Sequence, residues 1–232
     1  MLTMAADGRC SALVASWSGP VVVLGYAQPP KDVDLGMCQE RGIPVLRRLS
    51  GGTGVIHRED LTVALALPSD HPWAKGIVSL YDRFLAVLEP ALTEVGSRAR
   101  RIAEPRRASR VRSPICFEDQ LADTLVVDGR KAVGCSQTRR GGGVLIHAAV
   151  LLGLDVDLYS KIFNVDVKRV RRALAPAVSG VDWTVVADAV LGRLAVELET
   201  ELDPRPRPDP SAEHLAPYSQ ERWAPVLGVC SA

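Results

Sequence analysis

Short apolar runs separated by turn residues fill the first two thirds of the chain and predict β-strands. Ser18-Gly19-Pro20 separates the first two runs and predicts a hairpin or a bend between them. The last run is apolar almost throughout, which is typical of a strand that is buried on both faces. The five runs cover residues 12–17, 21–25, 43–46, 61–67 and 144–152.

Two further strands are predicted as a β-hairpin. Asp128-Gly129 separates an apolar run at 124–127 from a second run at 131–136. This dipeptide supplies the two residues with positive φ that a type I′ turn requires. A second turn is expected at residues 139–143.

Helical periodicity appears first at residues 73–95, where one face is apolar and Pro90 is expected to kink or end the helix. The apolar positions of that face are Ile77, Leu80, Tyr81, Phe84, Leu85 and Leu88. Further helices are predicted at residues 33–41, 155–163, 167–175 and 182–202.

Asp166 is the expected N-cap of the helix at 167–175. In the last helix the expected buried side comprises Val185, Val186, Ala189, Val190, Leu194 and Leu198. Strand runs combined with these helices predict an α+β fold, with a mixed and mostly antiparallel sheet flanked by helices. The organisation expected is one domain over residues 1–203, followed by a proline-rich tail at 204–232.

Composition narrows the function classes. The formal net charge is only +1, whereas a general nucleic-acid binder would be far more basic, so no nucleic-acid partner is expected. No apolar run reaches the length of a membrane span, and no His, Cys or Asp cluster has metal-ligand spacing. Five cysteines without a CxxC pair favour reduced thiols and a cytoplasmic location.

A basic, glycine-rich stretch lies between two of the apolar runs. It reads Arg47-Arg48-Leu49-Ser50-Gly51-Gly52-Thr53-Gly54-Val55-Ile56-His57, which is neither a P-loop nor a dinucleotide fingerprint. Glycine lets a backbone approach a ligand closely, and paired arginines favour an anion, so an acidic ligand is predicted here. A plain hairpin or loop is the alternative for this stretch taken alone.

Several motifs in one order carry a family resemblance. They are Gly25-Tyr26-Ala27-Gln28, the Arg-Arg-x-Ser-Gly-Gly turn ending at His57, Asp128-Gly129-Arg130-Lys131 with Gly134-x-x-Gln137-Thr138-Arg139, and Val144-Leu145-Ile146-His147. Over residues 12–174 the chain resembles the lipoate-protein ligase A and octanoyltransferase family, a relative of biotin protein ligases. The resemblance implies a biotin/lipoyl ligase catalytic fold and attachment of an octanoyl or lipoyl group to a lysine of a carrier domain.

The resemblance also implies roles for single residues. The family's lysine at the position of Lys131 holds the acyl oxygen, and cysteine-based octanoyltransferases carry Cys-Phe at the place of Cys116, with the same spacing to Lys131. Without the resemblance, Lys131 would be a solvated surface lysine and Cys116 a core cysteine. The substrate-binding residues implied are Arg47, Arg48, Ser50, Gly51, Gly52, Thr53, Gly54, His57, Gly134, Gln137, Thr138 and His147.

Three functions stay open at this point. The first is an octanoyltransferase that works through a Cys116 thioester, needs no cofactor and takes the acyl group from an acyl carrier protein. The second is a lipoate or octanoate ligase that uses ATP and Mg²⁺, forms an acyl-adenylate and needs a separate small subunit. The third is a non-catalytic homologue that binds the carrier.

Two departures from the family pattern bear on this choice. Transferases usually have Asp after the motif histidine, where this chain has Arg58, and His-Gly where this chain has His147-Ala148-Ala149. The second pattern is closer to two-subunit ligases. An arginine-dense run at residues 98–112 is expected to be a solvated loop, a docking surface for an acidic lipoyl carrier domain or acyl carrier protein, or both at once.

Overall fold

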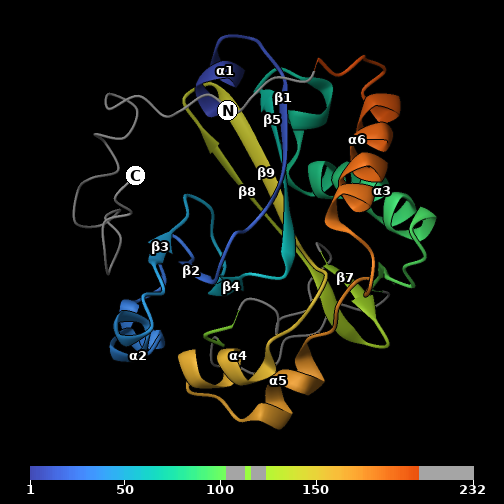
Figure 1. The fold of residues 1–232 in the computed structure, drawn as a ribbon. Coiled ribbons are helices and arrows are strands. Elements are labelled where there is room, and N and C mark those ends of the chain that lie inside the picture. The colour runs from blue at the N-terminus through green and yellow to red at the C-terminus, as the bar shows by residue number, and fades with distance from the viewer. Residues whose placement is uncertain (103–112, 116–123, 204–232) are drawn as a thin grey trace.

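A six-stranded antiparallel sheet forms the centre of the molecule (Figure 1). The computed structural model describes residues 1–102, 113–115 and 124–203. In spatial order the strands of this sheet are β1 (Ser11–Ser16), β5 (Asp60–Pro68), β9 (Gly143–Leu151), β8 (Arg130–Arg140), β7 (Thr124–Val127) and β6 (Arg100–Arg101).

A three-stranded sheet packs beside the large one. Its order is β3 (Val45–Arg47), β2 (Val21–Leu24) and β4 (Val55–His57), with β2 parallel to β3 and antiparallel to β4. The predicted fold class, an α+β fold with mixed and mostly antiparallel sheets, is therefore confirmed.

Helices lie on both sides of the large sheet (Figure 1). Helices α3 (Ile77–Glu94) and α6 (Trp183–Glu197) pack together on one face. Near the small sheet lie α2 (Leu35–Glu40), α4 (Val156–Ile162) and α5 (Val167–Ala173). The remaining helical elements are α1 (Leu2–Ala6) and the 3-10 turns η1 (Pro30–Asp32) and η2 (Pro72–Lys75).

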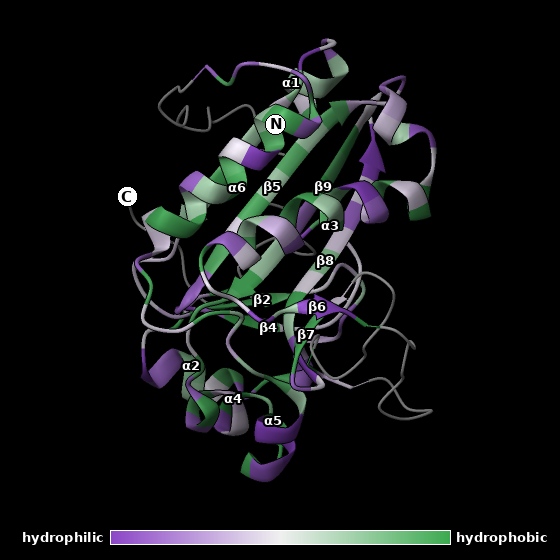
Figure 2. Ribbon diagram, turned by 90° about the vertical axis from the view of Figure 1, so that its right-hand side faces the viewer, coloured by the Kyte–Doolittle hydropathy of each residue, from purple (hydrophilic) through white to green (hydrophobic). Residues whose placement is uncertain are grey.

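The face under α3 and α6, called here the helix-covered face, holds a large apolar cluster. Strand residues that alternate along β5 and β9 point into it, such as Val63, Leu65 and Ile146, and they meet Phe84 and Leu88 of α3. Figure 2 shows the resulting green bands on β5 and β9. Burial of these side chains removes apolar surface from water, the main stabilising term in folding.

Some sequence expectations need correction. The first two strands do not form a hairpin: β1 pairs with β5, whereas β2 pairs with β3 and β4, so Ser18-Gly19-Pro20 is a bend between two sheets. Val55–His57 is a strand and not part of the glycine turn, because β2 offers it a pairing edge. Pro90 stays inside α3, where buried neighbours on the same helix offset its lost hydrogen bond.

The expected buried faces are also wrong at two positions. Ile77 is 59% exposed and Val185 is 49% exposed, since each lies in the first turn of its helix, outside the apolar cluster.

The last helix ends at Glu197, before the predicted residue 202. Residues 103–112, most of the arginine-dense run, and the tail at 204–232 lie outside the described residues. None of the helices in the described ranges combines the length and the apolar composition of a membrane span.

The β7–β8 hairpin forms as predicted, with φ of 50° at Asp128 and 74° at Gly129. Its register contains a feature that the pattern did not predict. Leu125 pairs with Val133, but the next residue, Val126, pairs with Lys131, so Ala132 is an extra residue in β8. Such a β-bulge changes the face to which the following side chains point.

Candidate functional site

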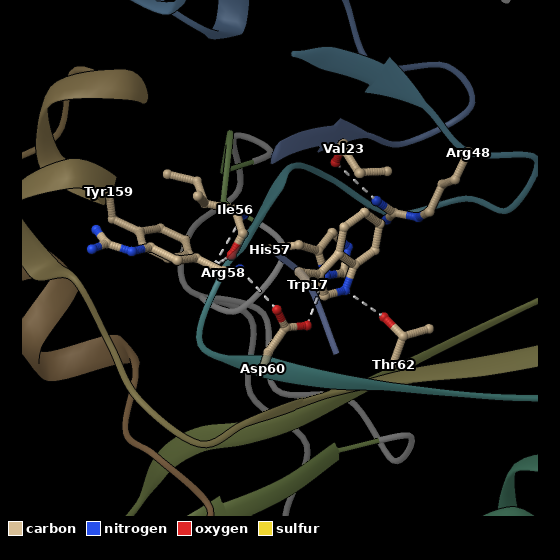
Figure 3. Close-up of polar contacts among 9 residues, drawn as sticks. All are labelled: Trp17, Val23, Arg48, Ile56, His57, Arg58, Asp60, Thr62 and Tyr159. Atoms are coloured by element: carbon tan, nitrogen blue, oxygen red, sulfur yellow. Dashed lines mark hydrogen bonds and ion pairs between the residues drawn. The ribbon is translucent and has the colours of Figure 1, made fainter. Parts of the chain in front are cut away.

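The glycine turn between β3 and β4 is held together by Arg48. Its guanidinium donates to the carbonyl oxygens of Gly51 at 2.7 Å, Thr53 at 3.0 Å and Val23 at 3.3 Å. The last of these bonds is drawn in Figure 3. Arg48 therefore stabilises the turn by binding its carbonyls, and its charge lies inside the loop.

Arg47 does the same for the neighbouring turn at Gly25-Tyr26-Ala27-Gln28. Its Nη1 donates to the carbonyl oxygens of Gly25, Tyr26 and Gln28 at 2.7–3.0 Å. The two arginines that were expected to contact substrate thus each bind backbone carbonyls of the site's own loops.

Two glycines are required by close packing within this region. A Cβ at Gly25 would overlap the carbonyl oxygen of Gly52, a backbone atom that cannot turn away. A Cβ at Gly54 would lie 2.5 Å from the Phe163 ring. The glycines let the two loops and the ring after α4 meet, a function different from the ligand approach expected from sequence.

Ser50 and His147 meet at the centre of the site. The Ser50 Oγ lies 2.6 Å from the His147 Nε2, which joins the glycine turn to β9. Burial, followed by electrostatic repulsion from Arg48 and His57, lowers the pKa of His147 to about 3. The His147 imidazole is therefore neutral at physiological pH.

His57 forms a second polar cluster, shown in Figure 3. Its Nδ1 lies 2.7 Å from the Asp60 carboxylate, which is 2% exposed, and its ring stacks on Trp17 with centroids 4.3 Å apart. Trp17 Nε1 donates to Thr62 Oγ1 at 2.9 Å. Because a carboxylate needs a donor, this pairing favours the His57 tautomer protonated at Nδ1.

Asp60 was not among the predicted site residues. The sequence showed only that Arg58 stands where transferases have Asp, but Asp60 supplies a carboxylate to His57, and Arg58 pairs instead with Asp155 at 2.7 Å. The spacing His57-x-x-Asp60, with the acid at the start of a buried strand, was the available signal.

Strand β8 divides the predicted residues between two faces. Ser136 lies opposite His147 in the ladder and donates to the Gly51 carbonyl at 3.2 Å, so Gly134, Ser136 and Thr138 belong to the face of the glycine turn, called here the polar face. Gln137 lies opposite Ile146 on the helix-covered face, and its Nε2 donates to the Ile77 carbonyl. The structure thus places the Gln137 side chain away from the other predicted residues.

Lys131 is buried, with 3% exposure. Regular alternation from Ser136 would direct it into the apolar cluster under α3 and α6. The bulge at Ala132 instead pairs Lys131 with Val126, which shares a face with Thr124 and Gly134. A single extra residue therefore brings the lysine to the polar face, a change that no spacing in the sequence reveals.

The described chain just before Cys116 is attached to the glycine turn. Gly54 N–H donates to the Pro114 carbonyl at 3.0 Å, and Gly54 and Ile115 form a parallel bridge. Gln28 Nε2 donates to the same Pro114 carbonyl at 2.9 Å. Cys116 itself lies outside the described residues.

Thr124 is a further buried polar group on the polar face. It is 0% exposed, and its Oγ1 has no hydrogen-bond partner among the described residues. An unpaired buried hydroxyl costs about 1–3 kcal/mol, so a ligand that supplied a partner would recover this energy.

The described segments contain no group of three or more His, Cys, Asp or Glu positioned to hold a metal ion.

A family model matches this architecture. Residues 4–184 match the lipoyl protein ligase A/B catalytic domain. Similar curated proteins are the octanoyltransferases LipM of Moorella thermoacetica, 35% identical over 163 residues, and of Carboxydothermus hydrogenoformans, 36% identical over 152 residues. The matched regions cover 68% and 65% of this chain but only 59% and 55% of those proteins.

Solved structures agree on the fold. The bi-partite lipoate protein ligase from Thermoplasma acidophilum has a TM-score of 0.69 and 21% identity, with 87% of this chain and 76% of that chain covered. Lipoate-protein ligase A bound with ATP has a TM-score of 0.70 and 23% identity, with 89% and 82% covered. At these identities the comparison establishes the arrangement of the elements, and function must be argued from the site.

Proposed function

Because the chain belongs to the lipoyl protein ligase A/B catalytic domain family, we propose that it transfers an octanoyl or lipoyl group to a lysine of a lipoyl carrier domain. The observation that carries the proposal is the burial of Lys131 on the polar face. Lysine is almost never fully buried without a specific role or partner. An ammonium held in this way stabilises negative charge on a carbonyl oxygen during acyl transfer.

The reaction proposed proceeds through Cys116 in two steps. The Cys116 thiol loses its proton and attacks the thioester carbon of an acylated carrier protein; a new C–S bond forms, the donor's C–S bond breaks, and the leaving thiolate takes up a proton. The acceptor lysine amine then attacks the enzyme thioester, the C–N bond forms, the amine loses a proton and the Cys116 thiol is released. Lys131 holds the acyl oxygen in both steps, and no cofactor takes part.

The polar face offers small side chains where an acyl chain would lie. Gly134 pairs with Ala149 in the ladder, between the Lys131 end of β8 and the Ser136–His147 pair. Both residues have small or no side chains, and Leu151, which is buried on the same face, adds apolar surface. These residues support an apolar substrate next to the buried lysine.

The ATP-dependent ligase is the second candidate, and the site fits it less well. A triphosphate at the glycine turn would need free positive charge, but Arg47 and Arg48 donate to backbone carbonyls of their own loops. The carbonyl oxygens gathered at Gly51 and Thr53 also disfavour an anion close to them. We therefore place the thioester mechanism first and keep ATP with Mg²⁺ for the alternative.

Intact-mass spectrometry of the full chain decides between the mechanisms. With octanoyl carrier protein, the wild type and Cys10→Ala, an exposed cysteine that serves as control, should each gain one octanoyl group, whereas Cys116→Ala should gain none. Acyl-adenylate formed from octanoate or lipoate with Mg-ATP, and retained in Cys116→Ala, would establish the ligase instead. Absence of acyl chemistry in both assays would favour the non-catalytic carrier-binding homologue.

The setting proposed is the cytoplasm. Cys10, Cys38 and Cys135 are free thiols within the described part of the chain, which is typical of reducing compartments. Burial, followed by the nearby Asp34 charge, raises the pKa of Cys38, and partial burial alone raises that of Cys10, so neither thiol is activated. The partners proposed are an acyl carrier protein as donor and an acidic lipoyl domain as acceptor.

A further inference from the structure

We propose that the exposed basic side of helix α5 is the docking surface for an acidic face of the protein domain that accepts the acyl group. The proposal rests on the proposed function, since it names the surface that would bind the acceptor. It places the partner on residues 167–173, and not on the arginine-dense run at 98–112, for which a docking surface was one of two interpretations.

The helix pair α4–α5 is attached to the glycine-turn side of the site. Tyr159 Oη of α4 donates to the Ile56 carbonyl and accepts from the Ile56 N–H, both at 3.1 Å, so it completes hydrogen bonds of β4 (Figure 3). Phe163, directly after α4, packs its ring against Gly54. Movement of this helix pair would therefore disturb the glycine turn.

The other end of the pair is attached to Lys131. Leu174, directly after α5, forms a parallel bridge with Lys131, and the Ala175 N–H donates to the Lys131 carbonyl at 3.1 Å. Both residues after the helix are buried. Helix α5 thus connects the molecular surface to the backbone of Lys131, the proposed catalytic lysine.

The exposed side of helix α5 is positively charged. Val170 is fully buried and faces inward, whereas Lys168, Arg171 and Arg172 are exposed. Their spacing of i, i+3 and i+4 puts them on one side of the helix. Most of α5 is accordingly purple in Figure 2.

These three charges are not neutralised within the described chain. No ion pair of 4 Å or less joins Lys168, Arg171 or Arg172 to a carboxylate among the residues that the structure describes. The nearest acid in sequence, Asp166, caps the helix by accepting from the Lys168 N–H at 2.7 Å. Like charges at this spacing destabilise a helix, so an anionic partner would relieve the repulsion.

A purely structural explanation covers only part of this pattern. Basic residues in the last turn complement the partial negative charge of a helix C-terminus, which accounts for Arg171 and Arg172. It does not account for Lys168 in the first turn, where a positive charge is unfavourable. The common feature of the three side chains is their shared exposed side.

The acceptor is a better occupant than the acyl donor. The acceptor amine lies at the end of a lysine side chain. The surface of the acceptor domain must therefore contact helix α5, beside Lys131, for the amine to reach the site. A donor that carries its thioester on a long flexible arm has no such need. Complementary charge would raise the association rate and lower the Michaelis constant without altering the chemical step.

The test is a triple charge reversal, Lys168→Glu, Arg171→Glu and Arg172→Glu, in the full chain. The matched control reverses three exposed cations elsewhere, Lys75→Glu, Arg83→Glu and Arg140→Glu. Thermal melts check folding of both variants. Acylation from octanoyl carrier protein and transfer from the acylated enzyme to an apo-lipoyl domain are then measured separately, between 50 and 300 mM NaCl.

The expected result is a roughly 10- to 100-fold loss of kcat/KM for the lipoyl domain through KM, weaker salt dependence, and acylation within about twofold of wild type. The control should match wild type. An unchanged KM, a loss confined to acylation, an equal loss in the control, or an altered oligomeric state of the triple variant would overturn the proposal. A wild type that transfers nothing to the lipoyl domain would contradict the proposed function itself, and the docking proposal with it.

Discussion

The two faces of the six-stranded sheet differ in what they bury. The helix-covered face meets α3 and α6 through apolar side chains such as Phe84, Leu88 and Val190. The polar face and the elements packed on it bury groups that are costly to remove from water. These groups are Gln28, Ser50, Thr53, His57, Asp60, Thr124 and Lys131.

Polar burial on this scale lowers stability, a cost that we attribute to the function proposed for this face. Most of the groups are paired: His57 with Asp60, Ser50 with His147, and Gln28 with the Pro114 carbonyl. Pairing limits the cost but rarely makes a buried polar group better than an apolar one. The helix-covered face should therefore supply the stability of the domain, and the polar face its activity.

Phe84→Ala should give the largest effect, and this effect should be on stability alone. Phe84 is 0% exposed in the apolar cluster, so truncation leaves a cavity and lowers the free energy of unfolding by about 3–5 kcal/mol. Urea denaturation measures the change. Val78→Ala, at a position 68% exposed on the same helix, is the control and should change it by less than about 0.5 kcal/mol. A similar loss in both variants would contradict the division between the faces.

Lys131→Met should give the opposite result. Removal of the ammonium should lower the rate of acyl transfer by about 10²–10³-fold, the usual loss when one donor to a developing oxyanion is removed. The melting temperature should stay close to wild type, because methionine keeps most of the buried volume. Lys75→Met on the surface is the control for transfer assays. Activity retained in Lys131→Met would remove this residue from the mechanism.

The neutral state of His147 predicts pH-dependent stability. Its pKa is about 3 in the folded chain and near the ordinary 6.5 when unfolded, so the unfolded chain alone binds the proton between these values. The contribution is complete above about pH 6.5 and is lost as the pH falls, by about 2 kcal/mol between pH 7 and pH 5. Denaturation at several pH values should show a shallower dependence in His147→Gln than in wild type. Equal slopes would mean that His147 titrates normally.

Thr124→Val should give the smallest effect, with opposite signs for stability and activity. Valine has nearly the same shape but lacks the hydroxyl, whose Oγ1 has no partner in the described structure, so the free energy of unfolding should rise by about 1 kcal/mol. If a bound acyl group uses the hydroxyl, kcat/KM should fall by up to about tenfold. Denaturation and steady-state transfer assays measure the two quantities. A loss of stability would show that the hydroxyl is already paired.

The fold was largely predictable from local patterns. Alternating or continuous apolar runs identified β1, β2, β5 and β9, and a 3.6-residue period identified α3. The Asp128-Gly129 turn was predictable because only residues tolerant of positive φ fit a type I′ turn, and both have positive φ. Ile77 was assigned wrongly because periodicity gives the apolar side of a helix but not where the neighbouring layer ends.

The candidate site was predictable only as a set of motifs. Ser50, His57, Lys131 and His147 were recognised in the sequence, but their partners were not. Arg47 and Arg48 were expected to contact an anion, whereas the folded loops surround both with backbone carbonyls. Asp60 was not predicted because its spacing from His57 is a weak signal until burial distinguishes it from an ordinary turn acid.

The sequence by itself determined the fold class, the order of the elements and the motifs, because these depend on residues close together along the chain. The tertiary structure alone decided which sheet each strand joined and which face each side chain met. The bulge at Ala132 shows the reason: one extra residue in β8 moves Lys131 from the apolar cluster to the polar face. Strand register is set by partners distant in sequence, so no local pattern could contain it.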